Sequence, residues 1–302
     1  MYFTPTPVEP FRFGGRVFYV KRDDLSHPLL SGNKFRKLYK LIHSPSKAID
    51  RIVSYGGTQS NAMLSIAALS HIKGWRFEYT SKSVPARIRQ TPEGNLRYAL
   101  ELGMQLHEVH PLEYEQAVER VLTLQNEETR TVVLPQGGAD PAAGEGITVL
   151  AEEIKAWQKE TGIATLTVAT PSGTGTTAAY LARSLETCTV VTVPSVGDAT
   201  YLRQQIGKLM PFPENLKILS TEKCYRFAAP HIDLLKTYEA LKAAGIIFDL
   251  LYAPVMWKAL LEYADKVQGE ILYVHSGGVL GNDTMLERYA LAKKKWSRNG
   301  RD

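Results

Sequence analysis

A lysine at position 34 stands among residues that suit a nucleophile. A glycine and an asparagine precede Lys34, and apolar residues then recur at helical spacing, namely Phe35, Leu38, Tyr39 and Ile42. The lysine is therefore predicted to open a helix. Because a helix N-terminus disfavours an ammonium group, the pKa of Lys34 should fall below the usual value of about 10.4, and a neutral amine attacks carbonyl groups. A solvated surface lysine would fit the same run, so the interpretation of Lys34 depends on the other motifs of the chain.

Two loops rich in glycine and hydroxyl residues each lie between a strand-like run and a helix-like run. The first, GGTQSNA (56–62), follows RIVSY (51–55), and the second, PSGTGTT (171–177), follows ATLTVAT (164–170). Glycines let backbone N–H groups approach an anion, and the helix start adds its dipole. The second loop is the better phosphate site because it adds hydroxyl donors. It lacks the Lys-Ser/Thr ending of a nucleotide-triphosphate loop and the glycine spacing of a dinucleotide fingerprint, and an ordinary turn is the alternative.

Short distinctive segments run along nearly the whole chain. They are KRDD (21–24), GNKFRKL (32–38), GGTQSN (56–61), GNLRYALELG (94–103), LPQGGADPAAGEG (134–146), SGTGTT (172–177), GIIFDLLY (245–252) and YVHSGG (273–278). In this order they resemble the fold-type II pyridoxal-phosphate enzymes, and more narrowly the family of 1-aminocyclopropane-1-carboxylate (ACC) deaminase and D-cysteine desulfhydrase. The resemblance implies pyridoxal 5'-phosphate as cofactor. It also implies an α/β fold with two open parallel-sheet domains, helices on both faces, like the tryptophan synthase β-subunit.

The resemblance implies roles for the residues that match the family's motifs. Lys34 would hold the cofactor covalently and exchange it for the amine of the substrate, and Asn61 would hydrogen-bond the cofactor's phenolic oxygen. Ser276 would contact the pyridine nitrogen. The 5'-phosphate would be bound by the second loop, which comprises Ser172, Gly173, Thr174, Gly175, Thr176 and Thr177.

The substrate would meet residues from both halves of the chain. The resemblance implies contacts from Gln59, Ser60, Asn61 and Tyr252, with Ser60 and Tyr252 joining Lys34 as catalytic candidates. Each has a plainer interpretation: Ser60 fits the N-cap of the following helix, and Tyr252 lies in an apolar run typical of a core. One serine can serve as both cap and proton carrier.

Two positions distinguish the branches of the family. Ring-opening deaminases carry a glutamate after the tyrosine and a leucine before the glycine pair, whereas this chain has Ala253 and Ser276. A carboxylate beside the ring nitrogen makes the cofactor a deep electron sink, which suits ring opening. A neutral hydroxyl is adequate for expelling a good leaving group. The sequence therefore favours α,β-elimination of D-cysteine or a related β-substituted amino acid, with ACC deaminase as the first alternative.

The chain also departs from the family pattern near the expected substrate. The loop of residues 56–62, here called the asparagine loop, ends in Ala62 where the family usually has a histidine. The segment APVMWKAL (253–260) brings in Pro254 and Trp257. These changes put the identity of the substrate in question more than cofactor binding. They leave a non-catalytic protein that binds pyridoxal phosphate as a second alternative.

Composition limits the class of protein. A chain of 302 residues at 44% hydrophobic can bury a substantial core, and its length suggests two domains. A membrane span needs about twenty apolar residues, and no stretch approaches this length. The N-terminus lacks the charged and apolar regions of a signal peptide, so a cytoplasmic protein is expected. The only cysteines, Cys188 and Cys224, read as reduced thiols, and the histidines lack paired-ligand spacing, so no metal is expected.

The net charge of +5 does not by itself indicate a nucleic-acid partner. The basic residues are spread out, and their densest cluster, AKKKWSRNGR (292–301), resembles a solvated tail. A positive surface also steers an anionic cofactor and carboxylate substrates. We therefore expect a small amino acid as partner, and neither nucleic acid nor membrane.

Strand-like and helix-like runs alternate along the chain, which predicts parallel sheets covered by helices. Besides the two strands already given, further strands are expected at 76–80, 105–109, 131–136, 189–193 and 271–275, and helices at 94–103, 144–162 and 178–185. The resemblance implies a large domain of residues 1–43 plus 157–302, an inserted small domain of residues 44–156, and a homodimer. In that layout Lys34 and the loop of residues 172–177, here called the phosphate loop, come from the large domain. The asparagine loop comes from the small domain.

Overall fold

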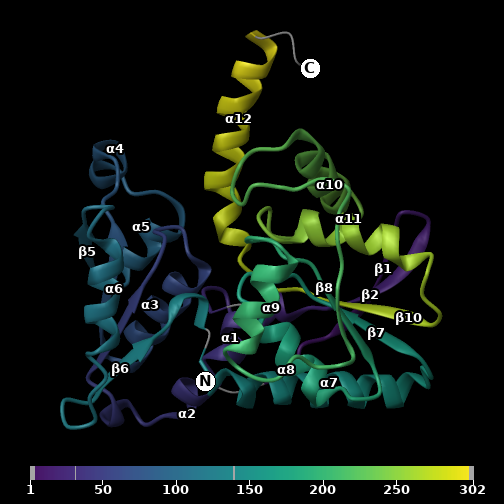
Figure 1. Ribbon diagram of the computed structural model, residues 1–302, viewed down its shortest axis with the longest axis horizontal. Helices are drawn as coiled ribbons and strands as arrows, with labels where there is room; N and C mark the ends of the chain where they lie inside the picture. The colour runs from purple at the N-terminus through teal and green to yellow at the C-terminus, as the bar shows by residue number, and fades with distance from the viewer. Residues whose placement is uncertain (1–3, 31, 139, 299–302) are drawn as a thin grey trace.

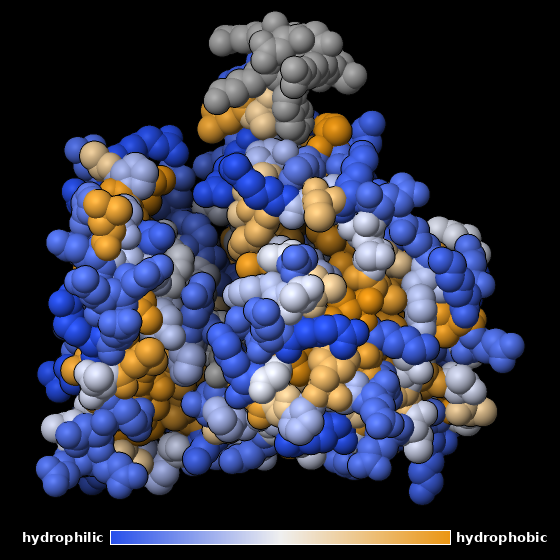
Figure 2. All heavy atoms as spheres, in the orientation of Figure 1, coloured by the Kyte–Doolittle hydropathy of each residue, from blue (hydrophilic) through white to orange (hydrophobic). Residues whose placement is uncertain are grey.

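Two sheets, each with helices on both faces, organise the chain into a larger and a smaller lobe (Figure 1). The computed structural model describes residues 4–30, 32–138 and 140–298. Parts of the expected domains, of segment 134–146 and of the basic tail therefore lie outside the described residues. Figure 2 shows largely polar side chains on this face and a furrow between the lobes.

The larger sheet has the strand order β1-β2-β10-β7-β8-β9, and only β1 runs antiparallel to its neighbour. At its centre, Leu272 of β10 pairs with Tyr19 on one side and with Val168 on the other. The strands are β1 (Val8–Phe13), β2 (Arg16–Lys21), β7 (Leu166–Ala169), β8 (Thr189–Thr192), β9 (Leu216–Ile218) and β10 (Glu270–Val274).

Successive strand residues of the larger sheet point to opposite faces, so the sheet carries two cores. Val168 and Val190 pack with α7 (Ala143–Thr161), α8 (Thr176–Ser184) and α9 (Ala199–Gly207). Ala169 and Val191 pack on the other face, which α10 (Ile232–Ala243) and α11 (Ala253–Ala264) cover. The last helix, α12 (Asn282–Arg298), rises from the top of the lobes in Figure 1.

The smaller sheet is entirely parallel and has the order β5-β4-β3-β6. One face packs on α3 and α5 in a core that includes Ile52 and Phe77, while Val53 and Val133 pack with α6 on the other face. The elements are β3 (Arg51–Tyr55), α3 (Asn61–Lys73), β4 (Arg76–Lys82), α4 (Ala86–Gln90), α5 (Gly94–Glu101), β5 (Gln105–Val109), α6 (Tyr114–Leu122) and β6 (Thr131–Leu134).

Two short helices join the lobes. The predicted helix after Lys34 is divided at Leu38 into α1 (Asn33–Lys37) and α2 (Tyr39–His43). Phe35, Leu38 and Ile42 pack into the core of the smaller lobe, whereas α1 also lies against α7 of the larger lobe. Single 3-10 turns complete the described elements, namely η1 (Asp23–Leu25), η2 (Ser46–Ala48), η3 (Gln136–Gly138) and η4 (Val279–Gly281).

A buried ion network fixes α1 against the larger lobe. The Arg36 guanidinium donates to both carboxylate oxygens of Asp23, at 3.0 and 2.8 Å, and to both oxygens of Glu153 on α7, at 2.6 and 2.8 Å. Lys21 Nζ lies 2.6 Å from Glu153 Oε2. Arg36, Asp23 and Lys21 are buried. The network thus joins segment 21–24 to the helix that carries Lys34.

The fold class predicted from the sequence is confirmed. Every predicted strand and helix has a counterpart that differs by a few residues at its ends, while β1, β2 and β9 were not predicted. The expected second domain boundary, near Trp157, falls inside α7, whose buried residues pack with the larger sheet. We therefore propose that the chain crosses from the smaller to the larger lobe before α7.

The described helices include none that is both long and apolar enough to span a membrane. Among the described residues, no three or more His, Cys, Asp and Glu side chains are grouped as a metal ion would need. The described cysteines are free thiols, with Cys188 buried and Cys224 exposed.

Each sheet reverses its strand order beside a loop singled out from the sequence. From β7 the larger sheet continues to β8 and β9 on one side, while β10 lies on the other side. From β3 the smaller sheet continues to β4 and β5, while β6 lies on the other side. Open α/β sheets bind ligands at the carboxyl ends of strands at such a reversal. The segments that begin there are 56–60, 135–138, 170–175 and 275–278.

Candidate active site

Lys34 is the second residue of α1 and lies between the two strand reversals. Burial lowers the pKa of Lys34 to about 8, and the charge of Asp249 opposes this effect. Its Nζ donates a hydrogen bond to Asn33 Oδ1 at 2.9 Å. The direction of the pKa shift matches the sequence prediction, but its main cause is burial rather than the helix dipole.

Asn33 ties the lysine to both loops of the larger lobe. Its backbone N–H donates to the carbonyl oxygen of Ser276 at 3.3 Å, and its Nδ2 donates to Thr177 Oγ1 at 3.4 Å. The preceding Gly32 has φ 63°, and a Cβ there would lie 2.0 Å from the Ser276 carbonyl oxygen. Only glycine fits this approach. The structure thus brings together three segments that are far apart in the sequence.

The loop of residues 172–177 is braced at its base and opens α8. Ser172 Oγ lies 2.7 Å from Thr192 Oγ1 on β8, and Thr174 Oγ1 lies 2.9 Å from Thr176 Oγ1. Gly175 has φ 76°, and a Cβ there would meet side chains of α9 at 2.6 Å. Ser172 and Thr176 are buried, so their hydroxyls brace the loop. Its backbone N–H groups and the half-buried Gly173 and Thr174 remain suited to an anion.

A second lysine, Lys37, lies in the site and was not predicted from the sequence. It is buried, its Nζ donates to the carbonyl of Gly137 at 3.0 Å, and burial and the charge of Lys34 lower its pKa well below the usual value. A Cβ on Gly137 would lie 3.3 Å from the Thr174 side chain, so Lys37 is close to the phosphate loop. The three-residue spacing from Lys34, which puts both lysines on one helix face, was the available signal.

Asn61 and Gln59 are held by the start of α5. Asn61 Oδ1 accepts a hydrogen bond from Asn95 Nδ2 at 2.8 Å, and a Cβ on Gly278 would lie 2.2 Å from Asn61 Nδ2. Gln59 Nε2 donates to the carbonyl of Glu93, and Gln59 Oε1 accepts from the backbone N–H of Asn95, both at 3.0 Å. Asn61 therefore faces the turn after β10, whereas the Gln59 amide is already engaged within the smaller lobe.

Ser60 caps α3, as one of its two interpretations from the sequence requires. Its Oγ accepts from the backbone N–H of Met63 at 3.3 Å. Beneath the loop, the Tyr79 hydroxyl donates to the carbonyl of Gly57 at 3.2 Å, and burial raises the pKa of Tyr79. The loop is thus supported from below, while Ser60 stays half-buried at its rim.

A buried carboxylate, Asp249, connects Tyr252 with Ser276. Asp249 Oδ1 accepts from the backbone N–H groups of Leu251 at 3.1 Å and Tyr252 at 2.6 Å, and Ser276 Oγ donates to Oδ2 at 3.5 Å. Burial raises the pKa of Asp249 to about 6, and these backbone bonds and the charge of Lys34 oppose it. Its signal in the sequence was an acidic residue within an apolar run, directly before a helix.

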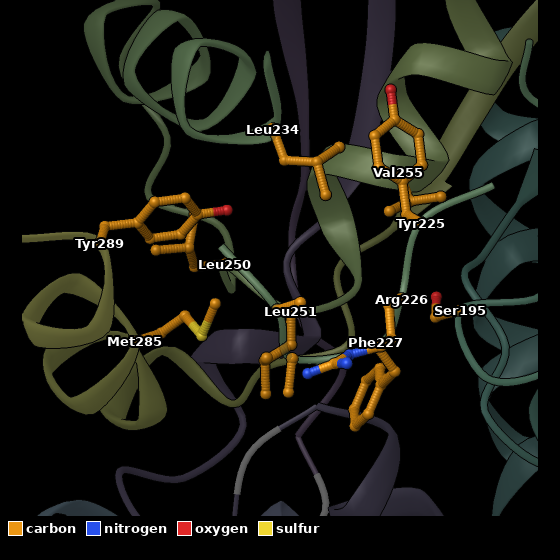
Figure 3. A pocket seen from close by; sticks show the side chains of 12 residues that line it. Ser195, Tyr225, Arg226, Phe227, Leu234, Leu250, Leu251, Val255, Met285 and Tyr289 are labelled. Atoms are coloured by element: carbon orange, nitrogen blue, oxygen red, sulfur yellow. The ribbon is translucent and has the colours of Figure 1, made fainter. Parts of the chain in front are cut away.

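Tyr252 lies over the phosphate loop. A Cβ on Gly173 would be 3.5 Å from its ring, and the ring of Phe227 lies 5.3 Å away between centroids. Burial raises the pKa of Tyr252, so its hydroxyl keeps its proton at neutral pH. Beside it is a small pocket with room for about one water molecule. Figure 3 shows its lining, which includes Arg226, Phe227, Leu251, Met285 and Tyr289.

The departures from the family pattern lie in the core. Trp257 is fully buried and packs against Phe18 and Tyr273, and Ala253 is fully buried in the same cluster. Pro254 stands in the first turn of α11, where its missing N–H costs nothing. That segment 253–260 lies close to the substrate stays a prediction, while the side chains of Trp257 and Ala253 are taken up by packing in the core.

The arrangement defines a class of protein, namely an α/β protein with an amine of lowered pKa between two loops suited to anions. The family profile described as "Pyridoxal-phosphate dependent enzyme" matches residues 1–249. The chain belongs to this family, and pyridoxal phosphate is its cofactor. The residues fit this group, because Lys34 offers an amine of lowered pKa and the glycine-rich start of α8 favours a phosphate.

Two curated proteins are similar over most of their length. A putative 1-aminocyclopropane-1-carboxylate deaminase of Thermotoga maritima is 25% identical, with 92% of this chain and 95% of that protein covered. The 1-aminocyclopropane-1-carboxylate deaminase of Burkholderia multivorans is 26% identical, with 92% and 93% covered.

Solved structures share the fold. An ACC deaminase homologue has a TM-score of 0.73 at 24% identity and covers 94% of both chains. A hydrogen sulfide-producing enzyme from Fusobacterium nucleatum has a TM-score of 0.64 at 15% identity, with 90% of this chain and 94% of that chain covered. These likenesses agree with the two-lobed, parallel-sheet architecture.

Proposed function

We propose that this chain deaminates a small β-substituted amino acid by α,β-elimination, with D-cysteine as the first substrate to try. D-Cysteine and water would give pyruvate, ammonia and hydrogen sulfide. The observation that carries the proposal is Lys34, an amine with a lowered pKa bonded through Asn33 to the phosphate loop and to Ser276.

The lowered pKa makes Lys34 a usable nucleophile and base. With a pKa of about 8, roughly a quarter of the amine is neutral at pH 7.5, compared with about 0.1% for an ordinary lysine. The gain in neutral amine is therefore on the order of 200-fold. A neutral Lys34 can attach the cofactor and, once released, can accept the α-proton of a substrate at its Nζ.

The other residues would orient the cofactor. Loop 172–177 and Lys37 would hold its phosphate, Asn61 its phenolic oxygen and Ser276 its ring nitrogen. When bound, the cofactor supplies an electron sink for the bond that breaks at the α-carbon. Domain closure at the furrow between the lobes would exclude water from the site.

Ser60 and Tyr252 are the candidates for moving a second proton. Ser60 stands at the rim of the asparagine loop, and Tyr252 stays protonated over Gly173. Tyr252 can donate to a departing group, and Ser60 can pass a proton while capping α3. The Gln59 amide is engaged with Asn95 and Glu93, so we propose that backbone N–H groups at the start of α3 meet the substrate carboxylate.

Ring opening of ACC is the second candidate, and a specific observation favours it. Asp249 places a carboxylate 3.5 Å from the Ser276 hydroxyl, so a negative charge stands behind the group proposed for the ring nitrogen. This weakens the argument that Ser276 alone leaves the nitrogen without a carboxylate. The curated relatives are also named ACC deaminases.

Product analysis separates the candidates. The protein loaded with pyridoxal phosphate is incubated with D-cysteine, L-cysteine and ACC in parallel, and pyruvate, sulfide and 2-oxobutyrate are measured. Pyruvate and sulfide in equal amounts from a cysteine support elimination. 2-Oxobutyrate from ACC alone contradicts our first choice. A protein that binds the cofactor and releases neither product would be the non-catalytic binding protein.

We further propose a cytoplasmic homodimer. Support for the dimer comes from the family resemblance, and support for the location comes from the pattern of the sequence. Light scattering on the purified protein tests the dimer, since a mass near 33.6 kDa would contradict it.

A further inference from the structure

The amide of Asn61 has a defined orientation, and Asn95 defines it. Asn95 is fully buried and is the second residue of α5, a helix that packs against α3 (Figure 1). Its Nδ2 donates to the backbone carbonyl of Gln59 at 3.0 Å and to Asn61 Oδ1 at 2.8 Å. A backbone carbonyl only accepts, so the Asn95 atom that contacts it must be the NH2 group.

This assignment fixes the next amide in turn. Because the Asn95 NH2 is a donor, the Asn61 atom that it contacts must be the oxygen, and the Asn61 NH2 is directed the other way. On that side lies Gly278, in the turn that follows Ser276. The orientation of the Gln59 amide is fixed in the same way. Its Oε1 accepts from the backbone N–H of Asn95, and its Nε2 donates to the backbone carbonyl of Glu93.

We propose that Asn95 is a positioning residue, which holds Asn61 so that its NH2 group, rather than its oxygen, is presented to the cofactor. The inference rests on the proposed role of Asn61 toward the cofactor's phenolic oxygen, an acceptor that only the NH2 group can serve. Without Asn95 the Asn61 amide could rotate, and half of its orientations would set oxygen against oxygen. Asn95 Oδ1 is itself buried without a hydrogen-bond partner among the described residues, so Asn95 holds a polar group at a cost.

Two substitutions separate positioning from packing. Asn95→Asp keeps the size of the side chain but turns the donor into an acceptor, which forces Asn61 to reverse. Asn95→Ala leaves Asn61 free to rotate. Positioning predicts that the aspartate variant shifts the cofactor readouts more than the alanine variant does, whereas a space-filling role predicts a loss of stability in both variants without such a shift. Asn215→Asp is the matched control, because Asn215 Nδ2 likewise donates to backbone carbonyls, but in the larger lobe.

The readouts are the affinity for pyridoxal phosphate and the pH at which the visible band of the bound cofactor titrates. A lost donor to the phenolic oxygen should weaken binding about tenfold and raise the titration pH by about one unit in Asn95→Asp. Asn215→Asp should lower the melting temperature and leave both readouts unchanged. Asn61→Ala is run beside them, so that failure of the role of Asn61 is told apart from failure of Asn95.

The outcomes are distinct. A shift in Asn61→Ala with a wild-type band in Asn95→Asp overturns the inference alone, and no shift in Asn61→Ala overturns the role of Asn61 with it. If neither Asn95 variant folds, 15N-labelled wild type decides. Added pyridoxal phosphate should shift the side-chain NH2 resonances of Asn61 and leave those of Asn95 in place, and the reverse pattern contradicts the proposal.

Discussion

Arg36 should be the residue that most strongly fixes the lysine helix in place. Replacing it with methionine keeps a chain of similar length and removes four hydrogen bonds, two to Asp23 and two to Glu153. Lys21 would then be the remaining cation beside both carboxylates, at 2.6 Å from Glu153 and 3.9 Å from Asp23. One buried negative charge would be left without compensation.

The size of the effect follows from burial. Arg36 and Asp23 are 1% and 0% exposed, and Glu153 is 10% exposed. Removing one partner of such a buried pair costs about 3–5 kcal/mol, which corresponds to a fall in melting temperature of about 5–15 °C. Arg36→Lys keeps the charge but cannot donate two hydrogen bonds to each carboxylate. Its loss of stability should therefore be roughly half that of Arg36→Met.

Thermal unfolding and a cofactor titration measure the two consequences. Because α1 carries Lys34 two residues earlier, Arg36→Met should also weaken binding of pyridoxal phosphate. The matched control is Arg89→Met, since Arg89 makes the same paired contact with Glu108, at 2.9 and 2.9 Å, on the surface. This exposed pair should contribute little. Equal melting temperatures for Arg36→Met and wild type would refute the reasoning.

Substitutions at three further positions test single contacts of the site. Asp249→Asn removes the charge that raises the pKa of Lys34, so cofactor attachment followed against pH should reach its midpoint at lower pH, and a midpoint moved upward would contradict this. Ser60→Ala should lower the free energy of unfolding by about 1 kcal/mol because the cap of α3 is lost, and Ser60→Asp should restore it. If Ser60→Asp also restores turnover, capping is the only role of Ser60. Gly278→Ala should weaken cofactor binding because a methyl group there meets the asparagine amide at 2.2 Å, whereas Gly15→Ala, with φ 78° and open space, should affect stability alone; equal binding by both would refute the contact.

Local sequence patterns predicted most of the sheet elements. Runs such as RIVSY and QLHEV are short, β-rich and bounded by turn residues, and they became β3 and β5 without change. Two of the three missed strands, β1 and β9, form the edges of the larger sheet. Pro10 interrupts the run that forms the edge strand β1, and β9 has three residues, too few for a period to register.

Helical periodicity located α1 but could not show its division. Phe35, Leu38 and Ile42 keep their spacing across the break, because all three pack into one core although Leu38 has φ −89° and ψ 10°. A buried helix that bends around a core retains the same pattern as a straight one. Periodicity records which face is buried and not whether the hydrogen bonds continue.

The missed site residues depend on contacts between distant segments. Arg36 meets Glu153, which is 117 residues away, and Asn95 meets Asn61 across 34 residues. Nothing in the local composition of either segment specifies its partner. Asp249 was not predicted as a site residue, although it accepts hydrogen bonds from the backbone N–H groups just before α11. The proximity of Asp249 to Ser276 depends on the order of strands in the sheet, which the local sequence does not show.

The central claim is that Lys34 holds the cofactor, and Lys37 offers a demanding comparison because it is also a lysine of lowered pKa in the same site. The protein is loaded with pyridoxal phosphate, reduced with borohydride to make any covalent link permanent, digested, and analysed by mass spectrometry. Our account predicts that the added mass lies on Lys34, and that Lys34→Ala carries none and loses the visible band. Added mass on Lys37 in the wild type, or an unchanged band in Lys34→Ala, would contradict it.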